Sequence, residues 1–349
     1  MEGSTSPTST YIGDNAPEEF LPYISKHWLK FLAPDPRVNY VLGIIYIFFM
    51  IFSLLGNGLI LFLIIRCPSL QTCSNCLVGS LALADFLMML KSPIFIVQSF
   101  HQGPTLGSLG CQVFGAMGSL SGFAAIWSVT AISVHRYLVF EDPFDKRKRF
   151  GRIGTAGVIA CIWSSSALIT VAPFVGFSRY VPEVPSECKL FICVNLFIPS
   201  CQVFGAMGSL SGFAAIWSVT AISVHRYLVF ADPFDKRKRF GRIGLQGKLN
   251  RVVILVVVIW VLSWTPYAAV VLIGAVRSQY LTPGMSMIPA LACKTSACIN
   301  PYIYGIRNPH FMMEVKRLFF RRRARTPSYR RELIPLSDFR SRLGIPDSV

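Results

Sequence analysis

The chain has 349 residues, of which 53% are hydrophobic and 15% charged, and its mean hydropathy is positive. Several apolar runs exceed the roughly 20 residues that a helix needs to cross a bilayer. The formal net charge of +17 would suit a nucleic-acid-binding protein, but the basic residues lie in short segments between apolar runs and leave no soluble domain to bind a nucleic acid. We therefore predict a multi-pass membrane protein.

Seven apolar segments are long enough to span a membrane, and we expect each to be helical. They are Val41–Ile65, Leu77–Phe100, Val113–Phe140, Thr155–Phe177, Phe191–Phe230, Val252–Val276 and Met285–Ile306. The prediction is an all-α bundle of seven transmembrane helices over residues 41–306. The fifth segment is overlong, because a wholly helical Phe191–Phe230 would measure about 60 Å against roughly 30 Å of hydrocarbon. We expect it to break near Pro199 or to begin outside the membrane.

Charge predicts the orientation of these segments. Basic residues gather in Asp142–Arg152, Asp232–Arg251 and Lys316–Arg342, whereas the loop Phe100–Gly110 has no full charge. Under the positive-inside rule the basic clusters are cytoplasmic, so the N-terminus is predicted to be extracellular. A basic inner face can also hold anionic lipid head groups.

The regions outside the bundle differ in character. Residues 1–40 lack an apolar core behind a basic region, so we expect an extracellular segment and not a cleaved signal peptide. After the seventh span, apolar residues recur at helical spacing between Phe311 and Leu318, with basic residues on the other side. This predicts an amphipathic eighth helix over 307–322 on the inner membrane surface, followed by a cytoplasmic tail over 323–349.

Two lysines lie inside apolar segments. An ionisable side chain at membrane depth costs several kcal/mol, so such residues are rare and usually functional. Lys294 is in the seventh segment, and Lys91 is in the second, six residues after Asp85. Lys91 either extends along its helix toward the outer interface or places its charge on the chemistry of Lys294.

Other polar residues in the segments need partners within the bundle. Asn57, Asp85 and Asn300 are predicted to form a polar cluster, and the alternative for Asn57 is a bond to a neighbouring carbonyl. In the sixth segment Pro266 favours a kink. Trp264 lies two residues before it and either packs or faces a ligand pocket.

The cysteines suggest one disulfide. Cys111 and Cys188 both lie at extracellular helix mouths, where the environment is oxidising, and a bond between them is plausible. The other cysteines fall mostly within helices, where packing is the simplest interpretation.

A long segment occurs twice. Cys111–Gly154 recurs as Cys201–Gly244, and the only difference is Glu141 against Ala231. Natural structural repeats diverge far more than this. The near-identity indicates a recent duplication, an exon-level splice event or an error in the gene model. The copy of the third-helix segment thus stands where the fifth helix is expected, with the correct direction across the membrane.

The motifs together resemble one family. They are GN at Gly56–Asn57, LALAD ending at Asp85, Cys111, HRY at His135–Tyr137, Trp163, Cys188, SWTPY at Ser263–Tyr267 and NPYIY at Asn300–Tyr304. This set resembles the rhodopsin-like G-protein-coupled receptors, and Lys294, six residues before Asn300, resembles the retinal-binding lysine of opsins. Segments such as MLKSPIFIVQSFHQG and LTPGMSMIPALACKTSACINP are similar to arthropod rhabdomeric opsins, and Lys91 resembles their ultraviolet-sensitive branch.

The resemblance implies a set of site residues. Lys294 would form a Schiff base with retinal, as 11-cis retinal or 3-hydroxyretinal, and Glu183 would be the counterion, although it stands one residue closer to Cys188 than in the family. Phe114, at the alternative counterion position, is uncharged. Other residues implied to line the pocket are Gly118, Gly122, Trp264 and Tyr267. A positive charge on Lys91 would disfavour a protonated imine and so favour ultraviolet absorption.

The resemblance also implies partners and a location. Asp85, Arg136, Tyr137, Asn300, Pro301 and Tyr304 would serve activation and coupling to a heterotrimeric G protein, of the Gq class that activates phospholipase C. Arrestin and a receptor kinase are further expected partners, and the expected location is the microvillar plasma membrane of a photoreceptor. His135 replaces the family's usual acidic residue beside Arg136, which removes a restraint on that arginine.

Three functions follow from these patterns. The favoured one is a light-activated receptor, which has no catalytic residues and no metal site. A receptor that has lost retinal would keep the HRY and NPYIY motifs, and a retinal photoisomerase would release 11-cis retinal without engaging a G protein. The copied segment also puts function in question, because packing suited to the third-helix position rarely suits another, and Cys201 would compete with Cys111 for Cys188.

Overall fold

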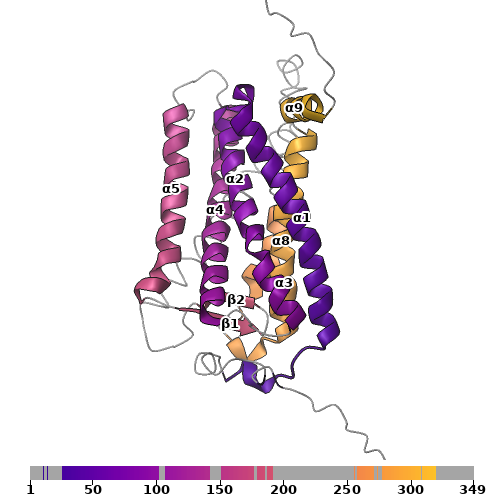
Figure 1. Cartoon of the computed structure of the whole chain (residues 1–349). Helices are drawn as coiled ribbons and strands as arrows, with labels where there is room; N and C mark the ends of the chain where they lie inside the picture. The colour runs from indigo at the N-terminus through magenta and orange to yellow at the C-terminus, as the bar shows by residue number, and fades with distance from the viewer. Residues whose placement is uncertain are drawn as a thin grey trace, which may run out of the picture.

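The computed structural model describes residues 11, 14, 26–101, 107–141, 151–176, 179–184, 187–191, 255, 258–270, 273, 277–307 and 309–319. Within these residues the long helices lie side by side in one bundle, and the short helix α9 lies across one end of it (Figure 1). The helices are α1 (Pro36–Arg66), α2 (Cys73–Leu90), α3 (Ser92–His101), α4 (Gly107–Glu141), α5 (Arg152–Val171), the helix Val258–Val270, α8 (Pro283–Arg307) and α9 (Pro309–Phe319).

Four stretches of the described chain are helical, long and apolar enough to cross a membrane. They are Pro36–Arg66, Cys73–His101, Leu109–His135 and Arg152–Val175, and they overlap the first four predicted spans. The helix Val258–Val270 and α8 overlap the sixth and seventh. The expected fifth span, apart from Phe191, and the copied block Cys201–Gly244 lie outside the described residues.

The second predicted span is divided into two helices. α2 ends at Leu90 and α3 begins at Ser92, so that Lys91 stands at the break between them. Pro93 has no N–H to donate and its ring clashes with the carbonyl one turn earlier, which interrupts a continuous helix. The Ile94 N–H donates to the Lys91 carbonyl at 3.1 Å, which closes a tighter turn at this point.

In the described part of the chain, α2 packs against α1, α4, α5 and α8. The Ser80 hydroxyl of α2 joins three helices. It shares a hydrogen bond with the Ser128 hydroxyl of α4 at 2.9 Å, and it accepts one from the Trp163 indole N–H of α5 at 3.1 Å. Leu77, Leu81 and Ala84 of α2 are fully buried around this contact. These bonds satisfy polar groups that would be costly to bury alone.

A hairpin covers the end of the bundle opposite α9. Its strands β1 (Arg179–Val184) and β2 (Glu187–Phe191) pair antiparallel and pack against α4 (Figure 1). The register aligns Pro182 with Cys188 and Val184 with Glu187, which leaves Glu183 without an opposite residue. Glu183 is therefore the extra residue of a β-bulge, a feature that locally bends a strand.

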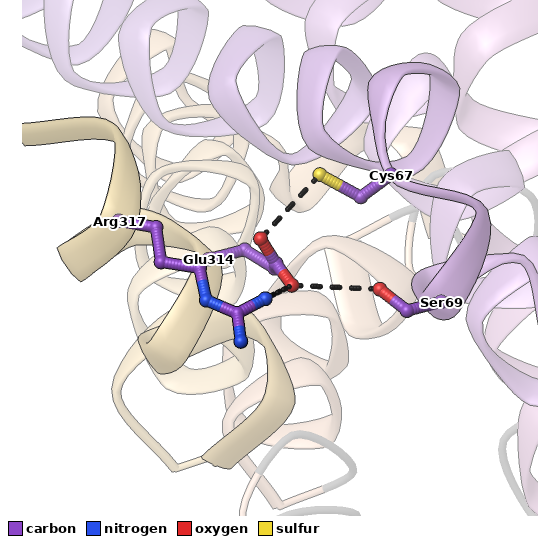
Figure 2. A network of polar contacts seen from close by, with 4 residues as sticks. All are labelled: Cys67, Ser69, Glu314 and Arg317. Atoms are coloured by element: carbon purple, nitrogen blue, oxygen red, sulfur yellow. Dashed lines mark hydrogen bonds and ion pairs between the residues drawn. The ribbon is translucent and has the colours of Figure 1, made fainter. Parts of the chain in front are cut away.

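A polar contact ties α9 to the turn after α1. Glu314 accepts hydrogen bonds from the Cys67 thiol at 3.8 Å and the Ser69 hydroxyl at 3.5 Å, and it pairs with Arg317 at 2.7 Å (Figure 2). Phe311 of α9 is fully buried beside this contact in the main apolar core. Burial and the Glu314 carboxylate together raise the pKa of the Cys67 thiol.

Candidate functional site

Lys294 lies within α8, between the two prolines of that helix, Pro289 and Pro301. Its side chain is only 7% exposed. The amine donates a hydrogen bond to the Ala290 carbonyl at 3.1 Å and lies 4.8 Å from the centroid of the Tyr46 ring of α1. A primary amine is therefore held inside the bundle beside an aromatic face, where a cation is favoured by the ring quadrupole.

The structure places the Lys91 side chain inside the bundle. Lys91 is 8% exposed, and its ammonium donates to the Phe114 carbonyl at 3.3 Å and lies 4.1 Å from the centroid of the Phe114 ring. The interpretation that Lys91 extends to the outer interface is therefore wrong, because the side chain crosses to α4. A Cβ built on Gly118 would collide with the Lys91 ammonium nitrogen.

Three aromatic rings lie between the two lysines. The Tyr46 ring that faces Lys294 stacks on Phe95 of α3, with centroids 3.9 Å apart, and Phe95 stacks on Phe114 at 6.5 Å. Tyr46 and Phe95 are each about 1% exposed, and all three belong to one buried cluster. No sequence pattern indicates this stack, because its members come from three separate helices.

Trp264 and Tyr267 approach the same interior from the helix Val258–Val270. The Trp264 indole stacks on Trp260 with centroids 5.4 Å apart and meets the Tyr267 ring edge-on at 6.3 Å. Its N–H donates to the Ser296 hydroxyl of α8 at 3.3 Å, two residues after Lys294. A Cβ on Gly122 would lie in ordinary contact with this indole, 3.7 Å away.

Of the predicted polar cluster of Asn57, Asp85 and Asn300, the structure joins the last two, between α2 and α8. The Asn300 amide donates to the Asp85 carboxylate at 2.9 Å, and both residues are almost fully buried. Asn57 instead donates to the carbonyls of Ser53 and Ala297, each at 3.0 Å, so the carbonyl alternative holds for this residue. Ser53 was missed from the sequence, although it precedes Asn57 by one helical turn and shares its face.

α1 and α8 approach closely beside this pair. A Cβ on Gly56 would stand 2.6 Å from the Pro301 side chain, so a larger residue at position 56 would separate the two helices.

No group of three or more His, Cys, Asp or Glu side chains suited to a metal ion occurs in the described part of the chain.

The predicted extracellular residues are only partly described. Cys111 is disulfide-bonded, and the expected partner Cys188 lies on β2, which packs against α4. The side chains of Cys188 and Glu183 are outside the described atoms, so this pairing and the counterion role of Glu183 stay predictions.

The predicted coupling residues lie near the other end of α4 and α8. His135, the residue before Arg136, is 6% exposed. Arg136 and Tyr137 follow it on α4, and Tyr304 is on α8, but the structure does not describe their side chains.

The described chain forms a bundle of apolar helices, with α9 across one end and a buried lysine in α8. This is the arrangement expected of a seven-transmembrane receptor. Residues 56–200 match the family model described as 7 transmembrane receptor (rhodopsin family). The crystal structure of squid rhodopsin superposes with a TM-score of 0.72 at 25% identity, over 85% of this chain and 89% of that one.

Curated relatives narrow the class. The chain is 34% identical over 336 residues to Opsin Rh3 of Drosophila melanogaster, which covers 90% of this chain and 86% of the relative. It is 32% identical over 324 residues to the protein named Opsin, ultraviolet-sensitive, of Apis mellifera, with 88% and 86% covered. The chain therefore belongs to the opsins of the rhodopsin family, which are multi-pass membrane receptors that couple to G proteins and not enzymes.

Proposed function

We propose that this chain is a light-sensing receptor that carries retinal on Lys294. The observation that supports the proposal best is the buried Lys294 amine, held in an aromatic surrounding at 4.8 Å from the Tyr46 ring. When bound, retinal, as the 11-cis or 3-hydroxy form, supplies light absorption and a change of shape. The family gives the cofactor class, and the aromatic residues around Lys294 suit an apolar polyene.

The residues around Lys294 have separable roles in this proposal. Trp264 and Tyr267, with Gly122 facing the indole, form an apolar wall that excludes water. Lys91 places a positive charge in the same interior, which disfavours a second positive charge on the nitrogen of Lys294. This favours ultraviolet absorption. Glu183, on the strand β1 that pairs with the strand of Cys188, is the proposed counterion of the protonated form.

Signalling is proposed to run through the opposite end of the bundle. Movement of the helix that contains Trp264 would open a cleft around Arg136 and Tyr137 for a G protein of the Gq class, as a ligand-driven shift between two states. The Asp85–Asn300 bond, Pro301 and Tyr304 lie on the path between Lys294 and that end. Arrestin, a receptor kinase and a microvillar membrane, with the N-terminus outside and the C-terminus inside, complete the proposal.

The copied segment favours a second candidate, an opsin-derived receptor that does not hold retinal. The block Cys201–Gly244 repeats the α4 sequence where the fifth helix is expected. A helix in that position closes one side of the pocket, and side chains chosen for the α4 position would fit poorly there. This candidate keeps the family and the coupling motifs but loses the pigment.

One experiment separates the two candidates. The full chain is expressed with 11-cis retinal, purified in the dark, and its absorption is recorded before and after illumination and after acid trapping. A light-sensitive band that is absent in Lys294→Ala supports the photopigment. Well-inserted protein without any band supports the receptor that lacks retinal.

A further inference from the structure

We propose that Phe114 and Gly118 of α4 set the absorption of this opsin by fixing where the Lys91 ammonium lies. The inference rests on the proposed function and deepens it. It assigns wavelength-determining roles to two uncharged residues, because both contact the charged end of Lys91. Phe114 and Gly118 are together called the lysine seat below.

The first half of the lysine seat is Phe114. Its carbonyl accepts a hydrogen bond from Lys91 at 3.3 Å, and its ring lies 4.1 Å from the same nitrogen. The carbonyl oxygen and the ring face are both negative, so both stabilise a cation over a neutral amine. Phe114 is 3% exposed, so water does not weaken these contacts.

The second half of the lysine seat is Gly118, whose lack of a side chain leaves room for the Lys91 ammonium. Gly118 follows Phe114 by one turn of α4, so the two face the same side of the helix. A Cβ at this position would meet the Lys91 nitrogen before any other atom, and the next atom it meets is the Cε of the same side chain at 3.5 Å. An alanine would therefore displace the flexible end of Lys91 and leave the backbone in place.

Packed rings connect the lysine seat to Lys294. Phe114 stacks on Phe95, Phe95 on Tyr46, and the Tyr46 ring faces the Lys294 amine. Stacked and buried rings resist displacement, because protein interiors are close-packed. The place of the Lys91 charge relative to Lys294 is therefore set by α4 and by this stack.

The test compares the single variants Gly118→Ala, Phe114→Leu and Lys91→Met. It also includes two double variants, in which Gly118→Ala or Phe114→Leu is combined with Lys91→Met. The ratio of visible to ultraviolet absorbance in the dark is measured at one fixed pH. Gly118→Ala and Phe114→Leu should each raise this ratio by about tenfold, the size of a desolvated cation–π contact. In the Lys91→Met background, neither substitution should raise the absorbance ratio further. Gly58→Ala is the control, because its Cβ would only touch Phe86 at 3.5 Å.

A second readout uses the retinal-free opsin. Gly118→Ala should lower its thermal unfolding midpoint by about 2 °C, and Lys91→Met should restore it, since the methionine has no ammonium to displace. If Gly118→Ala has the same effect in wild type and in Lys91→Met, on either readout, then Gly118 does not act through Lys91 and the inference is wrong. If wild type forms no Lys294-dependent pigment, the proposed function fails and the role in absorption fails with it. The retinal-free readout still shows separately whether Gly118 holds the Lys91 side chain.

Discussion

The Asn300 amide donates a hydrogen bond to the Asp85 carboxylate at 2.9 Å, and this bond joins α2 to α8 where both helices are buried. Asn300→Ala removes the donor and leaves the carboxylate in an apolar interior. We expect the free energy of unfolding to fall by about 1–3 kcal/mol, measured by thermal unfolding of the retinal-free opsin.

The matched control for this bond exchanges the partners. Asp85→Asn combined with Asn300→Asp keeps one amide and one carboxylate in the pair, so it should recover most of the stability lost in either single variant. Losses that simply add in the exchanged protein would mean that the two side chains stabilise the fold separately.

A second prediction concerns the chemistry of Lys294. Lys294→Arg keeps a positive charge at this position but replaces the primary amine with a guanidinium, which does not condense with an aldehyde under ordinary conditions. We expect no retinal band from Lys294→Arg, as from Lys294→Ala, while both proteins insert normally. Absorption after acid trapping, with surface expression as the control, checks this. A band that survives in either variant would place the attachment elsewhere.

Sequence and structure agree where a single side chain has one physical solution. A buried Asp85 needs a donor, so a partner such as the buried Asn300 amide was predictable. By contrast, the second span was expected to be one helix, and the break beside Pro93 was not predicted. Lys91 could extend toward the outer interface or reach a partner inside the bundle. Only the tertiary fold shows that it reaches the Phe114 carbonyl of α4. The ring stack and the Glu314 contact join residues far apart in the chain, and no periodicity encodes such pairs.

A third prediction uses the contact between α9 and the turn after α1. Burial, and then the Glu314 carboxylate, raise the pKa of the Cys67 thiol, whereas the Arg317 charge lowers it. Glu314→Gln should therefore lower that pKa, increase the thiolate fraction at neutral pH and speed alkylation of Cys67 several-fold. The rate is followed by mass spectrometry of the Cys67 peptide during reaction with iodoacetamide.

The control for Cys67 has the opposite sign. Arg317→Gln removes the charge that lowers the thiol pKa, so alkylation should slow, although this variant also loses the ion pair with Glu314. If both variants speed the reaction, the cause is exposure of Cys67 as α9 loosens, and the electrostatic account is wrong.

A fourth prediction concerns the residue before Arg136. His135 is buried near the end of α4, directly before Arg136. The family resemblance implies an acid at this position that restrains the arginine. His135→Glu should restore an ionic restraint and lower G-protein activation in the dark several-fold, since it stabilises the inactive state alone. Nucleotide exchange on a Gq-class protein measures this, and His135→Gln, which adds no charge, should leave the rate high.

The last prediction follows from the repeated sequence. Cys111 is disulfide-bonded, and Cys201 stands at the start of a near-identical segment. With Cys188 as the predicted partner, the two cysteines would compete for it during folding. Cys201→Ser should raise the fraction of chains with a Cys111–Cys188 bond and the yield of folded receptor, because one competing pairing is removed. Peptide mapping without reduction gives the fraction. Cys111→Ser should lower the yield, and an equal gain from both substitutions would show that the two segments exchange freely between positions.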